Sequence, residues 1–143
     1  MVVIKQVTTR KEQRQFVNFP LNLYKDCEYF VPCLYMDELA MFKKNYVYND
    51  QSESVFFNAY IDGKMVGRIQ GILQHASNNK WHQKRVRFTR FDSIDNQEVA
   101  NGLFNAIERW AKEKEMTEVV GPLGYSDLER EGLLIEGFDQ LST

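Results

Sequence analysis

The segment best suited to chemistry runs from Phe91 to Trp110, FDSIDNQEVANGLFNAIERW, and has the pattern of a strand end, a polar turn and a helix start. A helix N-terminus presents free backbone N–H groups and a partial positive charge, so it can bind a phosphate group. Close approach of a phosphate to the backbone requires small residues. Gln97, Ala100 and Gly102 stand at positions i, i+3 and i+5, and the last two are small. This spacing is compatible with a nucleotide-like cofactor.

The same segment also has an explanation that involves no ligand. Asp95 and Glu98 have the spacing of a capping box, in which side chains satisfy the first N–H groups of the helix from within. Both residues are acidic, and the turn contains no Lys or Arg that would attract a phosphate. The residues by themselves favour plain helix capping and leave phosphate binding open.

A carboxylate at a strand end is a second candidate. Asp92 lies where the expected strand ends, and a general base would be useful there, although a polar residue without a chemical role is the more common case. His75 and His82 have no carboxylate or cysteine at ligand spacing, so we expect no metal site. Cys27 has no nearby histidine in the sequence that would activate it as a nucleophile.

A third candidate is the stretch KWHQKRVRFTRF, Lys80 to Phe91, which mixes basic residues with aromatic ones and contains no acid. Such a mixture can bind single-stranded nucleic acid. The alternative is a solvated loop followed by a strand that alternates between core and surface. The formal net charge of −2 favours this alternative, so we expect no nucleic-acid partner. A local site for a cofactor phosphate is the better functional interpretation.

The composition predicts one globular domain. The chain has 143 residues, of which 43% are hydrophobic and 13% aromatic, enough for a substantial core. No apolar run is long enough for a signal peptide or a membrane span, and Cys27 and Cys33 fit reduced thiols, so we expect a cytoplasmic protein with no membrane partner. The many aromatic residues between Tyr24 and Tyr48 predict a core cluster or, alternatively, a substrate groove or dimer surface.

Periodicity and turn signals predict mixed secondary structure. Thr9 and Glu12 form a capping box that starts a helix ending near Asn18, since Pro20 discourages its continuation. We expect strands at 2–7, 85–92 and 117–121, a hairpin at 55–73, helices at 9–18, 37–44 and 95–114, and polar loops at 45–54 and 74–84. This order predicts an α/β (α+β) fold with a mixed central sheet flanked by helices and one parallel strand pair.

This order of elements resembles that of the GNAT acyltransferase superfamily. In that family the hairpin, the following strand and the helix after it form the half that binds acyl-coenzyme A. The family's pyrophosphate loop has Gln or Arg, two residues, Gly, one residue, and then Gly or Ala. Gln97, Ala100 and Gly102 lie on that spacing, with Ala100 in place of the first glycine.

Four blocks resemble, more specifically, a group of poorly characterised bacterial GNAT-like proteins: FVNFPLNLYKDCEYFVPCLYMDE, DGKMVGRIQG, EVANGLFNAIERWAKEKEMTEVVGPLGYS and GLLIEGFD. The likeness covers nearly the whole chain, and in that group a further long segment follows. Family enzymes often carry a tyrosine, as general acid, where this chain has Leu133. The chain also stops at Thr143, just where the last two strands would follow.

We therefore expect residues 1–143 to be a single GNAT-like domain, either on its own or as a fragment of a longer chain. Its C-terminal strands would be missing or supplied by a partner. Because the open edge of an unfinished sheet pairs readily, the C-terminal region is a candidate homodimer surface.

The resemblance implies transfer of an acyl group from acetyl-CoA, or another acyl-CoA, to a primary amine on a small molecule or peptide. Asp92 would be the general base, and Tyr125 would replace the missing acid. The cofactor would contact six residues: Phe91 and Ser93 along its pantetheine arm, and Gln97, Ala100, Asn101 and Gly102 at its diphosphate. The alternative is a non-catalytic GNAT-like binding or assembly domain, because a fold does not imply a function.

Overall fold

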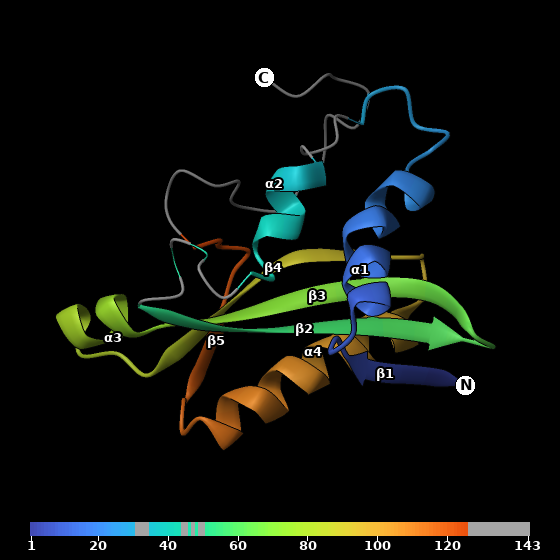
Figure 1. Ribbon diagram of the computed structural model, residues 1–143. Coiled ribbons are helices and arrows are strands. Elements are labelled where there is room, and N and C mark those ends of the chain that lie inside the picture. Colours follow the sequence, from blue (N-terminus) through green and yellow to red (C-terminus); the bar gives the residue numbers. More distant parts are fainter. Residues whose placement is uncertain (31–34, 44–45, 47, 49–50, 126–143) are drawn as a thin grey trace.

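A long hairpin forms the centre of the sheet (Figure 1). Strands β2 (Ser52–Ile61) and β3 (Lys64–Gln74) are joined by Asp62 and Gly63, whose φ angles of 50° and 78° are both positive. A two-residue turn of this kind matches the twist of the strands that it joins, which confirms the predicted hairpin. The structure describes residues 1–30, 35–43, 46, 48 and 51–125.

Three further strands complete the described sheet: β1 (Val2–Gln6), β4 (Arg85–Ser93) and β5 (Glu118–Val120). The strand order is β1-β2-β3-β4-β5, and every neighbouring pair is antiparallel except β4 and β5. The parallel pair follows from the helix that connects the two strands, as the sequence predicts. The mixed sheet with flanking helices confirms the predicted fold class.

Helix α4 (Gln97–Glu113) covers one face of the sheet, and its buried residues include Val99, Leu103 and Ile107. Two glycines of β3 let it pack closely. A Cβ atom at Gly67 would lie 2.9 Å from Leu103, and one at Gly71 would lie 2.9 Å from Ile107. A side chain at either glycine would force the helix away from the sheet.

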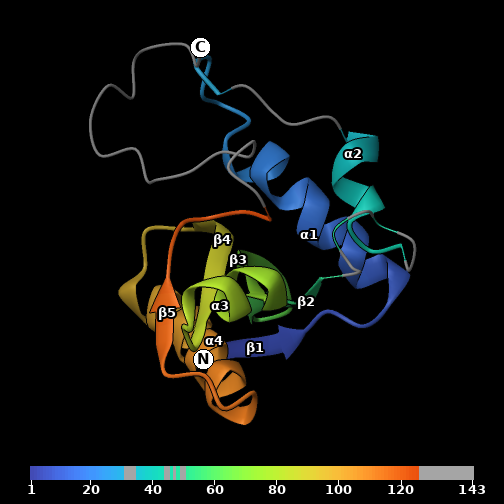
Figure 2. The ribbon, with the colours of Figure 1, turned by 90° about the vertical axis from the view of Figure 1, so that its left-hand side faces the viewer.

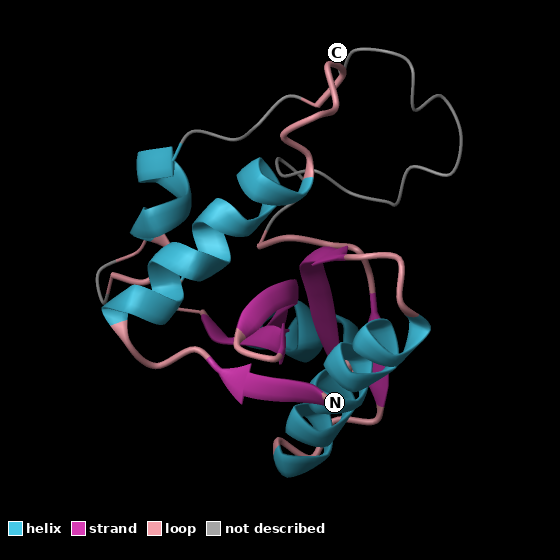
Figure 3. Cartoon of the chain, turned by 90° about the vertical axis from the view of Figure 1, so that its right-hand side faces the viewer, coloured by secondary structure: helices cyan, strands magenta, loops and turns pink. Residues whose placement is uncertain are grey.

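Helices α1 (Arg10–Leu23) and α2 (Tyr35–Ala40) lie on the opposite face, as Figures 2 and 3 show. A second core forms between them and the sheet from Phe16, Val17, Met41, Phe56, Ile72 and Tyr125. From the aromatic-rich stretch between Tyr24 and Tyr48, three partly buried residues pack against this core: Phe42, Tyr46 and Tyr48. Tyr29 and Tyr35 are exposed, so the predicted core cluster holds for part of that stretch.

Helix α1 continues past Pro20 to Leu23, so the predicted end near Asn18 is wrong. A proline inside a helix cannot donate to the carbonyl four residues earlier, here that of Phe16. Arg68 of β3 supplies the missing donor, since its Nη1 lies 2.9 Å from the Phe16 carbonyl oxygen. The helix continues because a distant residue satisfies the group that the proline leaves unpaired.

The predicted loop at 74–84 is also partly wrong, because it contains helix α3 (His75–Trp81). The helix ends at His82, which adopts the left-handed conformation typical of a C-terminal cap. Its Asn78 amide donates to the Arg85 carbonyl over 2.9 Å, which holds α3 against the start of β4. The expectations for Leu133 and the C-terminal strands lie outside the described residues.

Candidate active site

Strand β4 contains a β-bulge near its C-terminal end. Gln70 of β3 pairs with Thr89, whereas Arg68 pairs with Asp92, so β4 has one residue more than β3 between these two pairs. Arg90 lies in this stretch with a φ of 51°, an uncommon conformation for a residue other than glycine. Bulges of this kind redirect side chains and are frequent beside active sites.

The bulge reverses which residues of β4 face each side of the sheet. Phe88 and Phe91 are three positions apart, yet both rings contact Phe104 of α4, with centroids 4.9 and 4.8 Å away. In a regular strand such residues would point to opposite faces. The side chains of Arg90 and Asp92 consequently turn toward α1 and α2, where each forms an ion pair.

Asp92 is held by two side chains from different elements. The Tyr24 hydroxyl, at the end of α1, donates to its Oδ1 over 2.8 Å, and Arg68 Nε donates to its Oδ2 over 2.9 Å. The Arg68 and Asp92 side chains are only 7% and 16% exposed. Arg68 also lies over the ring of Phe16, 4.8 Å from its centroid. The set of Tyr24, Arg68 and Asp92 therefore joins α1 to the middle of β3 and to the end of β4.

Burial and charge shift the pKa values within this set. Burial, followed by the nearby Asp92 charge and hydrogen bond, raises the pKa of the Tyr24 hydroxyl far above its usual value. Tyr24 is therefore a protonated phenol throughout the neutral range. Burial lowers the pKa of Arg68, while the Asp92 carboxylate opposes that shift. The arrangement presents one proton donor and one oriented ion pair.

A second polar group lies beside the first on the same face. Arg90 forms an ion pair with Glu38 of α2, with Nε and Oε2 3.0 Å apart and side chains 16% and 11% exposed. Its Nη1 donates to Gln70 Oε1 over 2.9 Å, and Gln70 Nε2 donates to the Tyr125 hydroxyl over 2.8 Å. The same hydroxyl lies 2.6 Å from Ser54 Oγ. Tyr125 is thus connected to Arg90 through Gln70.

The two residues proposed from sequence as catalytic occupy different parts of this face. Asp92 belongs to the set with Tyr24, whereas the hydroxyl of Tyr125 is bonded to Ser54 and Gln70 and its side chain is 1% exposed. Tyr24 is the tyrosine that directly contacts the predicted base. The roles of Asp92 and Tyr125 stay predictions.

The outer edge of β4 is only partly paired in the described structure. Strand β5 pairs with Arg85 to Arg87, and Leu123 donates one further bond of 2.9 Å to the Phe88 carbonyl. Beyond that point the edge that includes Phe91 and Ser93 has no strand partner among the described residues. The Phe91 ring itself packs toward α4, and Ser93 Oγ donates to the Ile94 carbonyl, so only backbone groups face this edge.

The N-terminus of α4 is capped differently from the sequence prediction. Asn96, not Asp95, is the capping residue, and its Oδ1 accepts from the N–H groups of Glu98 and Val99 over 2.9 and 3.4 Å. A capping box requires an acidic residue three positions after the capping residue. Glu98 lies only two positions after Asn96, so it does not form one. Two of the backbone donors that a phosphate would use, those of Glu98 and Val99, are already bonded to Asn96.

The four residues predicted to hold a diphosphate all lie within α4 rather than in a loop: Gln97, Ala100, Asn101 and Gly102. Gln97 Nε2 donates to Asn101 Oδ1 over 2.9 Å along the helix surface. A Cβ atom at Gly102 would lie 3.0 Å from Cδ1 of Ile4. The small residue at this position therefore lets α4 pack against β1, which is an explanation that requires no ligand.

Sequence reasoning missed Tyr24, Arg68, Glu38 and Gln70. Arg68 and Gln70 carried a usable signal, because two polar residues at alternating positions of an otherwise apolar central strand must be satisfied inside the protein. Tyr24 and Glu38 carried none, since they come from helices whose position on the sheet only the fold reveals.

Among the described residues no cluster of His, Cys, Asp and Glu could hold a metal ion. None of the described helices has the length and apolar character needed to cross a bilayer.

Two curated proteins are similar to the chain, although no family model matches it. It is 26% identical over 140 residues to protein YghO of Escherichia coli (strain K12) and 32% identical over 136 residues to the bacterial ceramide synthase of Caulobacter vibrioides. The alignments cover 96% and 93% of this chain but 35% of each relative. The chain thus spans about a third of the length of the curated relatives that it matches.

Solved structures share the architecture at low sequence identity. A predicted acetyltransferase with acetyl-CoA from Clostridium acetobutylicum has a TM-score of 0.58 at 13% identity, covering 84% of this chain and 79% of that one. A tandem GNAT protein from the clavulanic acid biosynthesis pathway has a TM-score of 0.63 at 10% identity, covering 83% of this chain and 35% of that one. The chain has the GNAT fold, as its resemblance to that superfamily predicts.

Proposed function

We propose that the chain takes part in transferring an acyl group from acyl-CoA to a primary amine. The observation that carries this proposal is the set of Tyr24, Arg68 and Asp92, a protonated phenol beside an oriented carboxylate at the end of β4. Several solved structures with this fold are described as acetyltransferases. A merely structural strand end would not need a bulge that turns a buried ion pair toward the face opposite α4.

The residues present fit one part of acyl-CoA better than another. The backbone edge from Phe91 to Ser93 offers N–H and C=O groups that could pair with the amides of an extended arm, in the manner of an added strand. The start of α4 fits a diphosphate poorly, because Asn96 occupies the N–H groups of Glu98 and Val99, and because Asp95 and Glu98 are acidic. A diphosphate there would have to displace the Asn96 side chain.

The side chains of the set suit the proton transfers that such a reaction requires. When bound, acyl-CoA would supply a thioester carbonyl for attack by the amine; a C–N bond forms, the C–S bond breaks, and the thiolate must gain a proton. Tyr24 is protonated at neutral pH, so its hydroxyl can give a proton to the thiolate and regain one from Asp92, to which it is hydrogen-bonded. Asp92, oriented by Arg68, offers a negative charge to the amine and accepts its proton. We thus assign the acid role to Tyr24 in preference to Tyr125.

For the acceptor we propose a long-chain amine. One curated relative is named a bacterial ceramide synthase, and a ceramide is a long-chain amine that carries an N-acyl group. A cavity of about 380 Å³ on the same face of the sheet is lined by three apolar residues, Met41, Phe42 and Phe56, and by three polar ones, Ser52, Glu53 and Ser54. Phe56 pairs with Gln70, so this cavity adjoins the polar groups described above. Apolar walls next to polar groups are suited to an amphipathic substrate.

The direct test is formation of an amide. The protein would be incubated with palmitoyl-CoA or acetyl-CoA and with sphinganine or a short alkylamine, and the N-acyl product measured by mass spectrometry. Product detection is preferable to thiol detection, because Cys27 is exposed and reacts with thiol reagents. We expect product with sphinganine and a large loss in Asp92→Asn, while Asp26→Asn, on an exposed residue, serves as the matched control.

Binding separates the two functional classes. A ligand at 100 times its dissociation constant stabilises the folded state by about 2.7 kcal/mol, so thermal unfolding with either acyl-CoA gives a clear readout. Stabilisation without product would instead support the non-catalytic binding domain. Absence of both stabilisation and product would contradict the proposal.

A further inference from the structure

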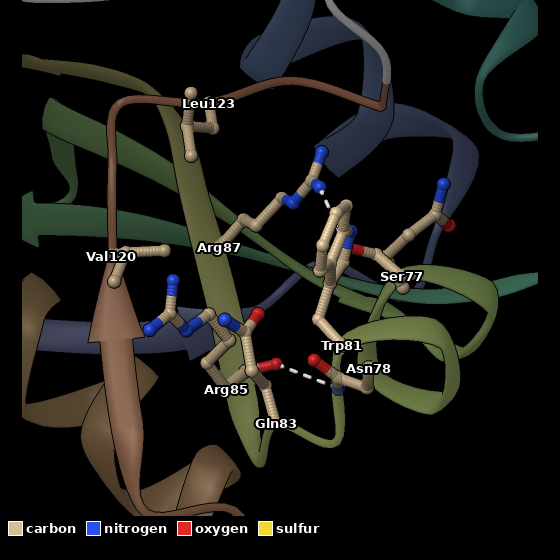
Figure 4. A pocket seen from close by; sticks show the side chains of 9 residues that line it. Ser77, Asn78, Trp81, Gln83, Arg85, Arg87, Val120 and Leu123 are labelled. Carbon is tan, nitrogen blue, oxygen red and sulfur yellow. Dashed lines mark hydrogen bonds between the residues drawn. The ribbon is translucent and has the colours of Figure 1, made fainter.

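A separate cavity of about 260 Å³ lies at the other end of β4, between α3, the first residues of β4 and the segment after β5 (Figure 4). Arg85 and Arg87 of β4 contribute to its wall, and seven positions separate Arg85 from Asp92. At about 3.3 Å per residue, this corresponds to roughly 20 Å along the strand. The cavity is therefore distinct from the candidate active site.

Positive charge in this cavity exceeds negative charge. Arg87 donates to the Gly124 carbonyl over 3.1 Å and to Ser77 Oγ over 3.4 Å, and it has no carboxylate partner among the described residues. Arg85 forms one ion pair of 2.9 Å with Glu118, a half-exposed residue. The two guanidinium groups thus have a single carboxylate between them, the one that Arg85 contacts. The excess positive charge favours binding of an anion.

Two buried polar atoms at the cavity wall have no partner among the described protein atoms. They are Nε of Arg85, a donor, and Oε1 of Gln74, an acceptor. Buried polar atoms are nearly always hydrogen-bonded, so each is an exception that calls for an explanation. An acceptor oxygen of a ligand would satisfy the donor, Nε of Arg85.

Three apolar residues, Trp81, Val120 and Leu123, also line the cavity, beside the polar residues Ser77, Asn78 and Gln83. Trp81, the last residue of α3, is 61% exposed, which is unusual for so large a side chain. Val120 and Leu123 line the cavity from the segment that includes the end of β5 (Figure 4). An exposed indole beside arginine side chains is suited to stacking on a planar ring.

We propose that this cavity binds a small aromatic anion, whose carboxylate or phosphate group is held by Arg85 and Arg87 and whose ring packs on Trp81. The volume admits a ligand of about one ring with its charged group, below the range typical of larger cofactors. This inference does not depend on the proposed acyl transfer, since it uses none of the same residues.

The test uses the indole of Trp81 as the reporter. The chain has two tryptophans, so a Trp110→Phe variant leaves Trp81 alone. Phenyl phosphate and benzoate would be titrated as the two aromatic anions, inorganic phosphate as the anion without a ring, and benzyl alcohol as the ring without a charge. We expect a saturable change in fluorescence with one or both aromatic anions, and at least about tenfold weaker binding of the other two probes.

Arg87→Gln should weaken this binding at least about tenfold, whereas Arg109→Gln, on an exposed residue of α4, should leave it unchanged. Because Trp110 lies against the core, calorimetric titration of the unmodified protein provides a second measurement. Absence of saturable binding in that titration, or equal affinity in Arg87→Gln, would overturn the proposal. Tighter binding of a single-stranded oligonucleotide, with a steep dependence on salt, would overturn it in favour of a nucleic-acid surface.

Discussion

The hydroxyl of Tyr24 donates a 2.8 Å hydrogen bond to Asp92, a residue 68 positions later in the chain. This bond connects the end of the first helix to the end of β4, and Arg68 completes the connection from β3. The three residues come from three elements, so they meet only when α1, β3 and β4 are packed together. It also provides the sharpest tests of the candidate site.

Tyr24→Phe removes the hydroxyl and keeps the ring. A hydrogen bond to a charged group contributes about 1.5–3 kcal/mol, so we expect urea unfolding to show a loss near the lower end of that range. If Tyr24 also donates a proton in catalysis, kcat should fall while KM changes little. Tyr29→Phe, on a partly exposed tyrosine, is the matched control. An unchanged kcat in an active preparation would remove Tyr24 from the mechanism.

Arg68→Met should be far more damaging than the loss of a surface ion pair. It leaves the Asp92 charge without its cation and the Phe16 carbonyl without its donor, and breaking a buried pair in this way costs about 3–5 kcal/mol. Arg85→Met breaks the more exposed pair with Glu118 and should cost under about 1 kcal/mol. Similar losses of unfolding free energy in both variants would contradict this account.

The N-terminal cap of α1 should depend on pH. A backbone hydrogen bond from Thr8 is the main cause that lowers the pKa of Glu12, so the carboxylate is more stable in the folded state. Its contribution is present above the unfolded pKa, near 4.5, and is lost as the pH falls through the lower folded value. The stability difference between wild type and Glu12→Gln should therefore shrink in acid urea titrations. A constant difference from neutral to strongly acidic pH would contradict the assignment.

Gly102 offers a test between packing and ligand binding. Alanine favours a helix over glycine by about 1 kcal/mol, but its Cβ would approach Ile4. Ile4→Val removes Cδ1 of Ile4. We expect Gly102→Ala to raise the free energy of unfolding more in the Ile4→Val background than in wild type. The measurement is a double-mutant cycle of unfolding free energies. Additive effects, together with reduced acyl-CoA affinity in both backgrounds, would instead assign Gly102 to a cofactor site.

Features that depend on neighbouring residues could be predicted from the sequence. The Thr9 and Glu12 capping box, the Asp62-Gly63 hairpin and the apolar period of α4 are of this kind, because each is determined within a few residues. Periodicity and turn signals predicted the order of the elements, and the resemblance of that order to a family indicated the fold. Local rules failed at Pro20, because the group that rescues the helix is on another strand.

The candidate site was predictable only in part. Asp92 could be proposed from its position at a strand end, but its contacts depend on the bulge at Arg90, which reverses the alternation that a sequence pattern assumes. The cap of α4 moved by one residue because Asn96 competes with Asp95 for the same helix end. In each case a contact from outside the local window, or a competitor of similar propensity, decided the outcome.

The two glycines of β3 have a mechanical consequence for the candidate site. Val99 and Leu103 pack over Gly67, and Ile107 and Trp110 pack over Gly71. The helix is therefore held against β3 at two points. Sliding along the strand would require both points to disengage together. The distance from the start of α4 to the end of β4 is therefore determined by how the helix packs on these two glycines.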